Sequence, residues 1–145
     1  MKKEMQLEFD ANSENEALAR VVIAAFMTNL DPTLDEIQDV KTAVSEAVTN
    51  AIIHGYQKKD GKVCMKARLE DTMLKIDVID KGVGIEDVQQ AMQPLYTSKP
   101  EEERSGMGFS FMEAFMDELS VESRVGEGTT VHMEKQLKKS ENRLR

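Results

Sequence analysis

The chain has 145 residues and a formal net charge of -8, with 27 acidic against 19 basic side chains. A field of this sign repels nucleic acid and anionic lipid, so direct binding to DNA or to a membrane surface is disfavoured. No apolar run approaches the ~20 residues of a membrane span, and the first residues lack the apolar middle region of a secretory signal. We therefore expect a cytoplasmic protein with one domain over residues 1–138 and a frayed, charged tail over residues 139–145.

The spacing of apolar residues in the N-terminal part of the chain predicts one strand followed by two helices. Residues 4–10 alternate apolar and polar side chains, which predicts a half-buried strand, and residues 13–29 carry apolar side chains at helical spacing. A second helix is predicted to begin after Pro32, to run to about His54 and to stop at Gly55. Its expected buried stripe consists of Leu34, Ile37, Val40, Val44, Ala47, Val48 and Ala51.

The remainder of the chain predicts two hairpins separated by an irregular segment and a helix. Residues 62–70 and 73–80 alternate and are joined by a short turn, as in an antiparallel hairpin. Residues 82–105 contain prolines, glycines and an acidic run, which favour a mobile lid with a short helical pattern near residues 88–92. A last helix is expected from Met107, followed by a hairpin that turns at residues 126–128.

This order of elements predicts an α+β fold. Mostly antiparallel strands would form one sheet, and the helices would cover one face of it as a two-layer sandwich. A ligand would then lie between the two layers.

Three polar side chains of the second helix share one stripe. Glu46, Asn50 and His54 are spaced by four residues, so they lie one above the other on the helix surface. The stripe faces either a binding site or water, and a solvated helix face is the plainer interpretation.

A carboxylate and two glycines follow the second predicted hairpin strand. Asp80 stands at the strand end, and Gly82 and Gly84 come at alternate positions after it. Such glycines allow backbone to approach a flat ligand closely. A carboxylate there could accept from an exocyclic amine and so discriminate adenine from guanine by hydrogen-bond pattern. A simple turn after a strand is the alternative.

Glycines also precede the last predicted helix. The backbone amides near Gly106 and Gly108 and the positive end of the helix dipole would face an anion, for which phosphate is the obvious candidate. Lys99 and Arg104 in the predicted lid could meet a terminal phosphate, or they could be solvated surface charges.

Taken in order, these motifs resemble a known superfamily. Residues 46–55 read Glu-x-x-x-Asn-Ala-x-x-His-Gly, residues 80–85 read Asp-x-Gly-x-Gly-Ile, residues 106–109 read Gly-Met-Gly-Phe, and residues 128–131 read Gly-Thr-Thr-Val. They resemble the nucleotide-binding motifs of the gyrase, Hsp90, histidine kinase and MutL (GHKL) ATPases, over residues 4 to about 138. The segments 46–56 and 94–99 are similar to those of bacterial anti-sigma factors with serine kinase activity.

The resemblance implies the Bergerat-type ATPase fold and a role for each matched residue. Asn50 would hold Mg²⁺, while Glu46 would act as general base. Arg104, which could meet the terminal phosphate, is the second candidate catalytic residue. Asp80 would bind the adenine amine, with Thr129 or Thr130 near the same edge, and the alignment does not decide between the two threonines. The residues implied to bind ATP or ADP are Asn50, His54, Asp80, Gly82, Gly84, Ile85, Thr97, Ser98, Gly106, Met107, Gly108, Phe109, Thr129 and Thr130.

By resemblance, the chain is expected to be a protein serine kinase that uses Mg-ATP to phosphorylate a small anti-anti-sigma antagonist. It is also expected to bind and inhibit a sporulation sigma subunit of RNA polymerase, and to form a homodimer through the strand that carries Met5, Leu7 and Phe9. Arg20 on the first helix is a candidate docking residue or an ordinary exposed arginine.

Two alternatives remain for the activity. A stand-alone catalytic domain of a histidine kinase shares these motifs but acts on a histidine in a helical hairpin, for which the sequence shows no candidate. A binding module that uses nucleotide only to set its shape is the second alternative, and an intact Glu46 argues against it.

Overall fold

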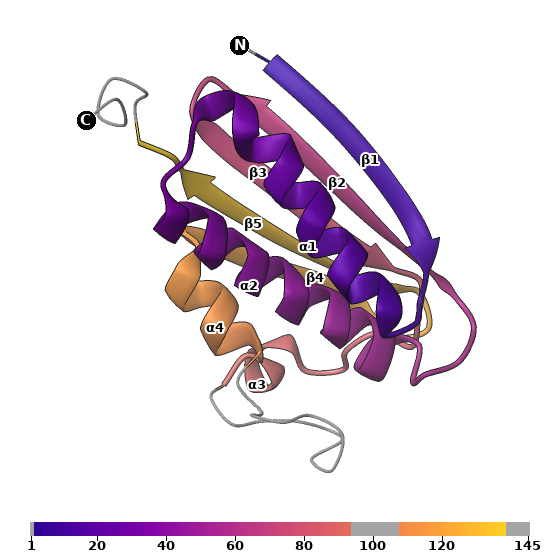
Figure 1. The fold of residues 1–145 in the computed structure, drawn as a ribbon. Coiled ribbons are helices and arrows are strands. Elements are labelled where there is room, and N and C mark those ends of the chain that lie inside the picture. The colour runs from indigo at the N-terminus through magenta and orange to yellow at the C-terminus, as the bar shows by residue number, and fades with distance from the viewer. Residues whose placement is uncertain (1, 94–107, 139–145) are drawn as a thin grey trace.

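The computed structural model describes residues 2–93 and 108–138. In these ranges one antiparallel sheet has the strand order β1-β2-β3-β5-β4, and helices cover one of its faces (Figure 1). The predicted α+β two-layer sandwich is therefore confirmed. The strands are β1 (Lys2–Asp10), β2 (Lys62–Glu70), β3 (Met73–Asp80), β4 (Glu118–Arg124) and β5 (Gly128–Gln136).

The helical layer is formed by α1, α2 and α4, with the short α3 beside it (Figure 1). The helices are α1 (Glu14–Met27), α2 (Leu34–Asn50), α3 (Val88–Ala91) and α4 (Gly108–Phe115). None of the helices within the described ranges combines the length and the apolar character needed to cross a bilayer. Met107, the expected start of the last helix, lies outside the described residues.

The core lies between the sheet and the helices, as the alternation of the strands requires. Side chains of β2 and β3 that face the helices are almost fully buried, and those between them face the opposite side of the sheet. The hairpin bounds predicted from the sequence, 62–70 and 73–80, match β2 and β3 residue for residue. A clear two-residue period on both strands explains this agreement.

The second helix begins at a capping box. The Thr33 side chain accepts from the Glu36 backbone N–H at 3.1 Å, and the Glu36 carboxylate accepts from the Thr33 N–H at 2.9 Å. The prediction that Leu34 belongs to the buried stripe is wrong, because this side chain is 80% exposed. At 100° per residue Leu34 lies roughly 90° from the centre of the stripe, so the first turn presents it to solvent.

Candidate functional site

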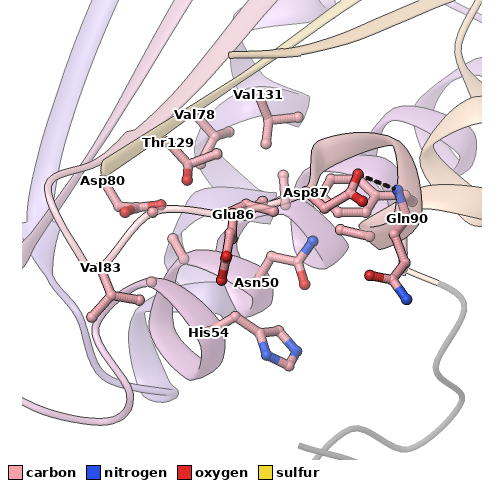
Figure 2. A pocket seen from close by; sticks show the side chains of 18 of the residues that line it. Asn50, His54, Val78, Asp80, Val83, Glu86, Asp87, Gln90, Thr129 and Val131 are labelled. Atoms are coloured by element: carbon pink, nitrogen blue, oxygen red, sulfur yellow. Dashed lines mark hydrogen bonds between the residues drawn. The ribbon is translucent and has the colours of Figure 1, made fainter. Parts of the chain in front are cut away.

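A cavity of about 530 Å³ lies between the end of α2, the end of β3, the start of β5 and the start of α4 (Figure 2). Both layers of the sandwich contribute to it, in agreement with the predicted position of a ligand site. Its lining residues from the helical side include Asn50, His54, Gly108, Phe109 and Ser110, and those from the strands and the loop after β3 include Asp80, Gly84, Ile85, Glu86, Asp87 and Thr129.

Asp80 and Thr129 form one end of the cavity, which we call the strand end. The Asp80 residue is only 6% exposed, and its Oδ1 accepts from the Gly82 backbone N–H at 2.9 Å. Burial raises the pKa of the Asp80 carboxyl, whereas hydrogen bonds from the backbone N–H groups of Gly82 and Thr129 act in the opposite direction. A carboxylate has about four acceptor positions, so Asp80 can still accept a donor from a ligand.

The glycines around Asp80 allow three segments to meet. A Cβ on Gly55 would lie 2.7 Å from the Asp80 carboxylate, and a Cβ on Gly82 would lie 2.0 Å from the Gly55 carbonyl oxygen. The Val83 backbone N–H also donates to that carbonyl at 2.9 Å. Gly82 does not line the cavity formed by the described residues, and this close backbone crossing explains why it is glycine.

Gly84 fixes the path of the loop along the cavity wall. Its φ of +79° is a backbone conformation that favours glycine, and a Cβ there would lie 2.2 Å from the Arg124 carbonyl oxygen. The following residue, Ile85, donates its backbone N–H to the Ser123 hydroxyl at 2.7 Å. The loop after β3 is therefore held against the β4–β5 hairpin while Gly84 and Ile85 line the cavity.

The structure distinguishes the two candidate threonines. Thr129 pairs with Asp80 in the β3–β5 register, is 7% exposed and lines the cavity beside that carboxylate (Figure 2). Thr130 follows it on a strand whose side chains alternate, so Thr130 lies on the opposite face of the sheet and pairs there with Ile79 and Glu122. Of the two threonines only Thr129 lines the cavity formed by the described residues, so contact between a threonine and a ligand stays a prediction that favours Thr129.

Asn50 and His54 form the other end of the cavity, which we call the helix end. After Asn50 the helix widens into a π-helical turn, Ala51–Gly55, which the sequence analysis expected to be ordinary α-helix. The Asn50 Nδ2 atom is buried and has no hydrogen-bond partner among the described residues. An unpartnered buried amide at a cavity wall is costly, so it indicates a position where a ligand completes the bonding.

The remaining predicted residues divide into three groups. Glu46 is half-buried one turn before Asn50, and it does not line the cavity formed by the described residues. Gly108 and Phe109 at the start of α4 do line it. The predicted residues Thr97, Ser98, Lys99, Arg104, Gly106 and Met107 lie outside the described residues.

Several lining residues were missed by the sequence analysis. The segment from Glu86 to Gln90 forms a wall of the cavity, and the Asp87 side chain caps α3 by accepting from the Gln90 N–H at 3.1 Å (Figure 2). The short helical pattern near residues 88–92 predicted α3 itself. Because residues 82–105 were interpreted as a mobile lid, the contribution of this segment to the cavity wall was not predicted. Ser123, which was also missed, does not line the cavity formed by the described residues but bonds to the lining residues Ile85 and Thr129. Its register position opposite Thr129 identifies it once the pairing is known.

Comparison with known proteins assigns the family. The family described as "Histidine kinase-like ATPase domain" matches residues 9–135. A relative from Clostridium acetobutylicum, named anti-sigma F factor, is 58% identical over 137 residues, which cover 94% of this chain and 96% of the relative. One of the same name from Geobacillus kaustophilus is 57% identical over 141 residues, which cover 97% of both chains.

Solved structures support the same fold at lower identity. The RsbU and RsbW domains of a Mycobacterium tuberculosis protein superpose with a TM-score of 0.68 at 22% identity, covering 93% of this chain and 32% of that one, so this chain spans about a third of its length. The catalytic domain of histidine kinase ThkA gives a TM-score of 0.55 at 18% identity, covering 91% of this chain and 97% of that domain. The chain belongs to the histidine kinase-like ATPase family and, within it, to the anti-sigma F factors.

Proposed function

We propose that this protein is a serine kinase and an anti-sigma factor. It would transfer the γ-phosphoryl group of Mg-ATP to a serine of an anti-anti-sigma antagonist, and it would bind and inhibit a sporulation sigma subunit of RNA polymerase. The observation that carries the proposal is one cavity with a buried acceptor, Asp80, at its strand end and an unpartnered amide, Asn50, at its helix end.

The strand end suits adenine. An ionised Asp80 can accept from the exocyclic amine of adenine, while guanine would present a carbonyl oxygen at that position and leave two acceptors facing each other. Thr129 lies beside Asp80 and can bond to the neighbouring ring position. This arrangement supports an adenine nucleotide as the ligand.

The helix end suits a metal ion that is held mainly by phosphates. Among the described residues no group of three or more His, Cys, Asp or Glu side chains could hold a metal ion. Mg²⁺ in nucleotide sites is held by one or two protein oxygens together with phosphates and water, and the side-chain oxygen of Asn50 would be such a ligand. The unpartnered Asn50 Nδ2 is a hydrogen-bond donor, so it would suit a phosphate oxygen beside the ion. When bound, the ion would supply neutralisation of the phosphate charge.

The proposed transfer needs a base for the attacking hydroxyl. The serine oxygen of the antagonist would form a bond to the γ-phosphorus as the bond to the leaving oxygen of ADP breaks, and the hydroxyl proton would pass to Glu46. Gly108 and Phe109 at the start of α4 would contact phosphates. Gly106, Met107, Thr97, Ser98 and Arg104 are proposed to assist them on the strength of the sequence resemblance.

The partners are proposed from the names of the relatives and from exposed surfaces. Both relatives are named anti-sigma F factors, so a sigma subunit is the proposed target, and we place the protein in the cytoplasm with it. On α1 the apolar Leu18 and Val21 are 42% and 65% exposed next to Arg20, which makes this surface a candidate docking site. The edge strand β1 is the proposed homodimer contact.

One experiment separates this proposal from its two alternatives. The protein is incubated with γ-labelled ATP, Mg²⁺ and cognate cell extract, and the products are treated with acid. Acid-stable label on a small protein supports serine transfer, and acid-labile label supports a histidine kinase. Nucleotide binding without label on any protein supports a binding module and contradicts the kinase proposal.

A further inference from the structure

We infer that Ser123 is a positioning residue that directs the hydroxyl hydrogen of Thr129 into the cavity. The site would then favour a purine that carries a hydrogen-bond acceptor next to its exocyclic amine, as adenine does. The inference rests on the proposed binding of ATP. It concerns a side chain on β4 that lies behind the cavity wall and is separated from the loop residue Ile85 by 38 positions in the sequence.

Three polar groups surround the Ser123 hydroxyl. It accepts from the Ile85 backbone N–H at 2.7 Å, lies 3.1 Å from the Gly128 carbonyl oxygen and lies 2.8 Å from Thr129 Oγ1. A hydroxyl has a single hydrogen to donate. Ser123 can therefore donate either to Gly128 or to Thr129, and the choice decides what Thr129 can do.

The two arrangements present opposite chemistry to the cavity. If Ser123 donates to the Gly128 carbonyl, the Thr129 hydroxyl donates to Ser123 and only its lone pairs face a ligand. If Ser123 donates to Thr129 instead, the Thr129 hydrogen is released toward the cavity. Ser123 thus determines whether Thr129 is an acceptor or a donor for the ligand.

The adenine edge selects the second arrangement. Its amine donates to Asp80, and the adjacent N1 ring nitrogen is an acceptor, so Thr129 must donate to it, directly or through one water. The bond from Ser123 to Thr129 then continues into the bond from Thr129 to the base, and such chains strengthen each member. The contact from Ile85 holds Ser123 in place because it occupies one of the serine lone pairs.

The test compares ATP with 1-deaza-ATP, in which a C–H group replaces the N1 nitrogen. Wild-type protein should bind 1-deaza-ATP roughly tenfold more weakly than ATP, because one hydrogen bond is lost. Ser123→Ala removes the donor that orients the Thr129 hydroxyl and strengthens its bond to the base, but it leaves Thr129 able to donate. It should therefore weaken ATP binding about twofold more than 1-deaza-ATP binding, which reduces the ratio from about tenfold to about fivefold. Ser123→Thr keeps the hydroxyl and should restore the ratio.

Controls distinguish positioning from structural support. Ser120→Ala changes a serine on the same strand that faces the other side of the sheet, so the ratio should stay at the wild-type value. If Ser123→Ala does not fold, Ser123→Cys replaces it, since a thiol is a weak donor and should also reduce the ratio.

Two results would overturn the inference while leaving ATP binding intact. One is equal weakening of both nucleotides by Ser123→Ala, which would give Ser123 a purely structural role. The other is equal affinity of the wild-type protein for both nucleotides. Absence of ATP binding by the wild-type protein would instead overturn the proposed function itself.

Discussion

The two ends of the cavity differ in how fully the described residues complete their hydrogen bonds. At the strand end Asp80, Ser123 and Thr129 bond to one another or to backbone groups of adjacent segments. At the helix end the buried Asn50 Nδ2 has no partner in the described part of the chain. A preorganised end can discriminate between bases, whereas an incomplete end relies on the ligand to supply its partners.

The largest effect is expected from Glu46, one turn before the helix end, where a substitution should separate phosphoryl transfer from ATP binding. Glu46→Ala removes the proposed base and should lower phosphoryl transfer by about 10²–10⁴-fold, while ATP affinity stays within about twofold. Transfer is measured with γ-labelled ATP and purified antagonist, and affinity by calorimetry. Glu46→Gln keeps the size of the side chain and should behave like the alanine variant, and normal transfer by either variant would exclude Glu46 as the base.

Asp80→Asn tests whether the strand end recognises the base. The amide would turn a donor toward the adenine amine, so ATP affinity should fall about 30-fold, the value of about one charge-assisted hydrogen bond. Calorimetric titration with ATP measures the change. Asp77→Asn is the matched control, because Asp77 lies on the same strand but on the opposite face. Unchanged ATP affinity in folded Asp80→Asn would contradict the assignment of the strand end to the base.

Gly82→Ala tests the crossing that joins the two ends. Its new Cβ would meet the Gly55 carbonyl at 2.0 Å, so we expect a loss of about 2 kcal/mol in the free energy of unfolding. Gly126→Ala has no atom within 4 Å of its new Cβ and should show only the smaller cost of its φ of +80°. Urea denaturation compares the two variants, and equal losses would show that the crossing is not tight.

The smallest expected effect is a change in stability with pH, caused by His132 on the sheet face away from the cavity. Burial lowers the pKa of His132, but hydrogen bonds from its ring to Glu134 at 2.7 Å and Asp77 at 2.6 Å outweigh this, so its pKa is raised above 6.5. The protonated ring is therefore favoured in the folded protein. Its stabilisation is fully present below the unfolded pKa and is lost as the pH rises through the folded pKa.

His132→Gln should accordingly destabilise the protein by about 0.5–1 kcal/mol at pH 5.5 and by less at pH 9. Unfolding curves at the two pH values measure the difference. ATP affinity should not change, because His132 does not line the cavity formed by the described residues. A reversed pH dependence would show that the ring is neutral in the folded protein.

Local periodicity predicted the fold better than it predicted the details of the site. The β2–β3 hairpin was found to the residue, since its alternation depends only on neighbouring positions. The π-helical turn Ala51–Gly55 has no local signal, because its path depends on contact with the loop after β3.

The polar residues of the site show the same limit. Asp80 was recognised from its position at a strand end before two glycines. Choosing Thr129 over Thr130 required the side of the sheet that each residue faces, and finding Ser123 required the β4–β5 register. Both depend on pairing between distant segments, which one sequence does not determine.

The π-helical turn limits the distance that a ligand can span between Asn50 and Asp80. Asn50 immediately precedes this turn, Gly55 ends it, and Gly55 rests against the Asp80 carboxylate. The separation between the amide and the carboxylate therefore depends on this short turn and on the packing of Gly55 against Asp80. A molecule that bonds to both groups must therefore have a span that matches this separation.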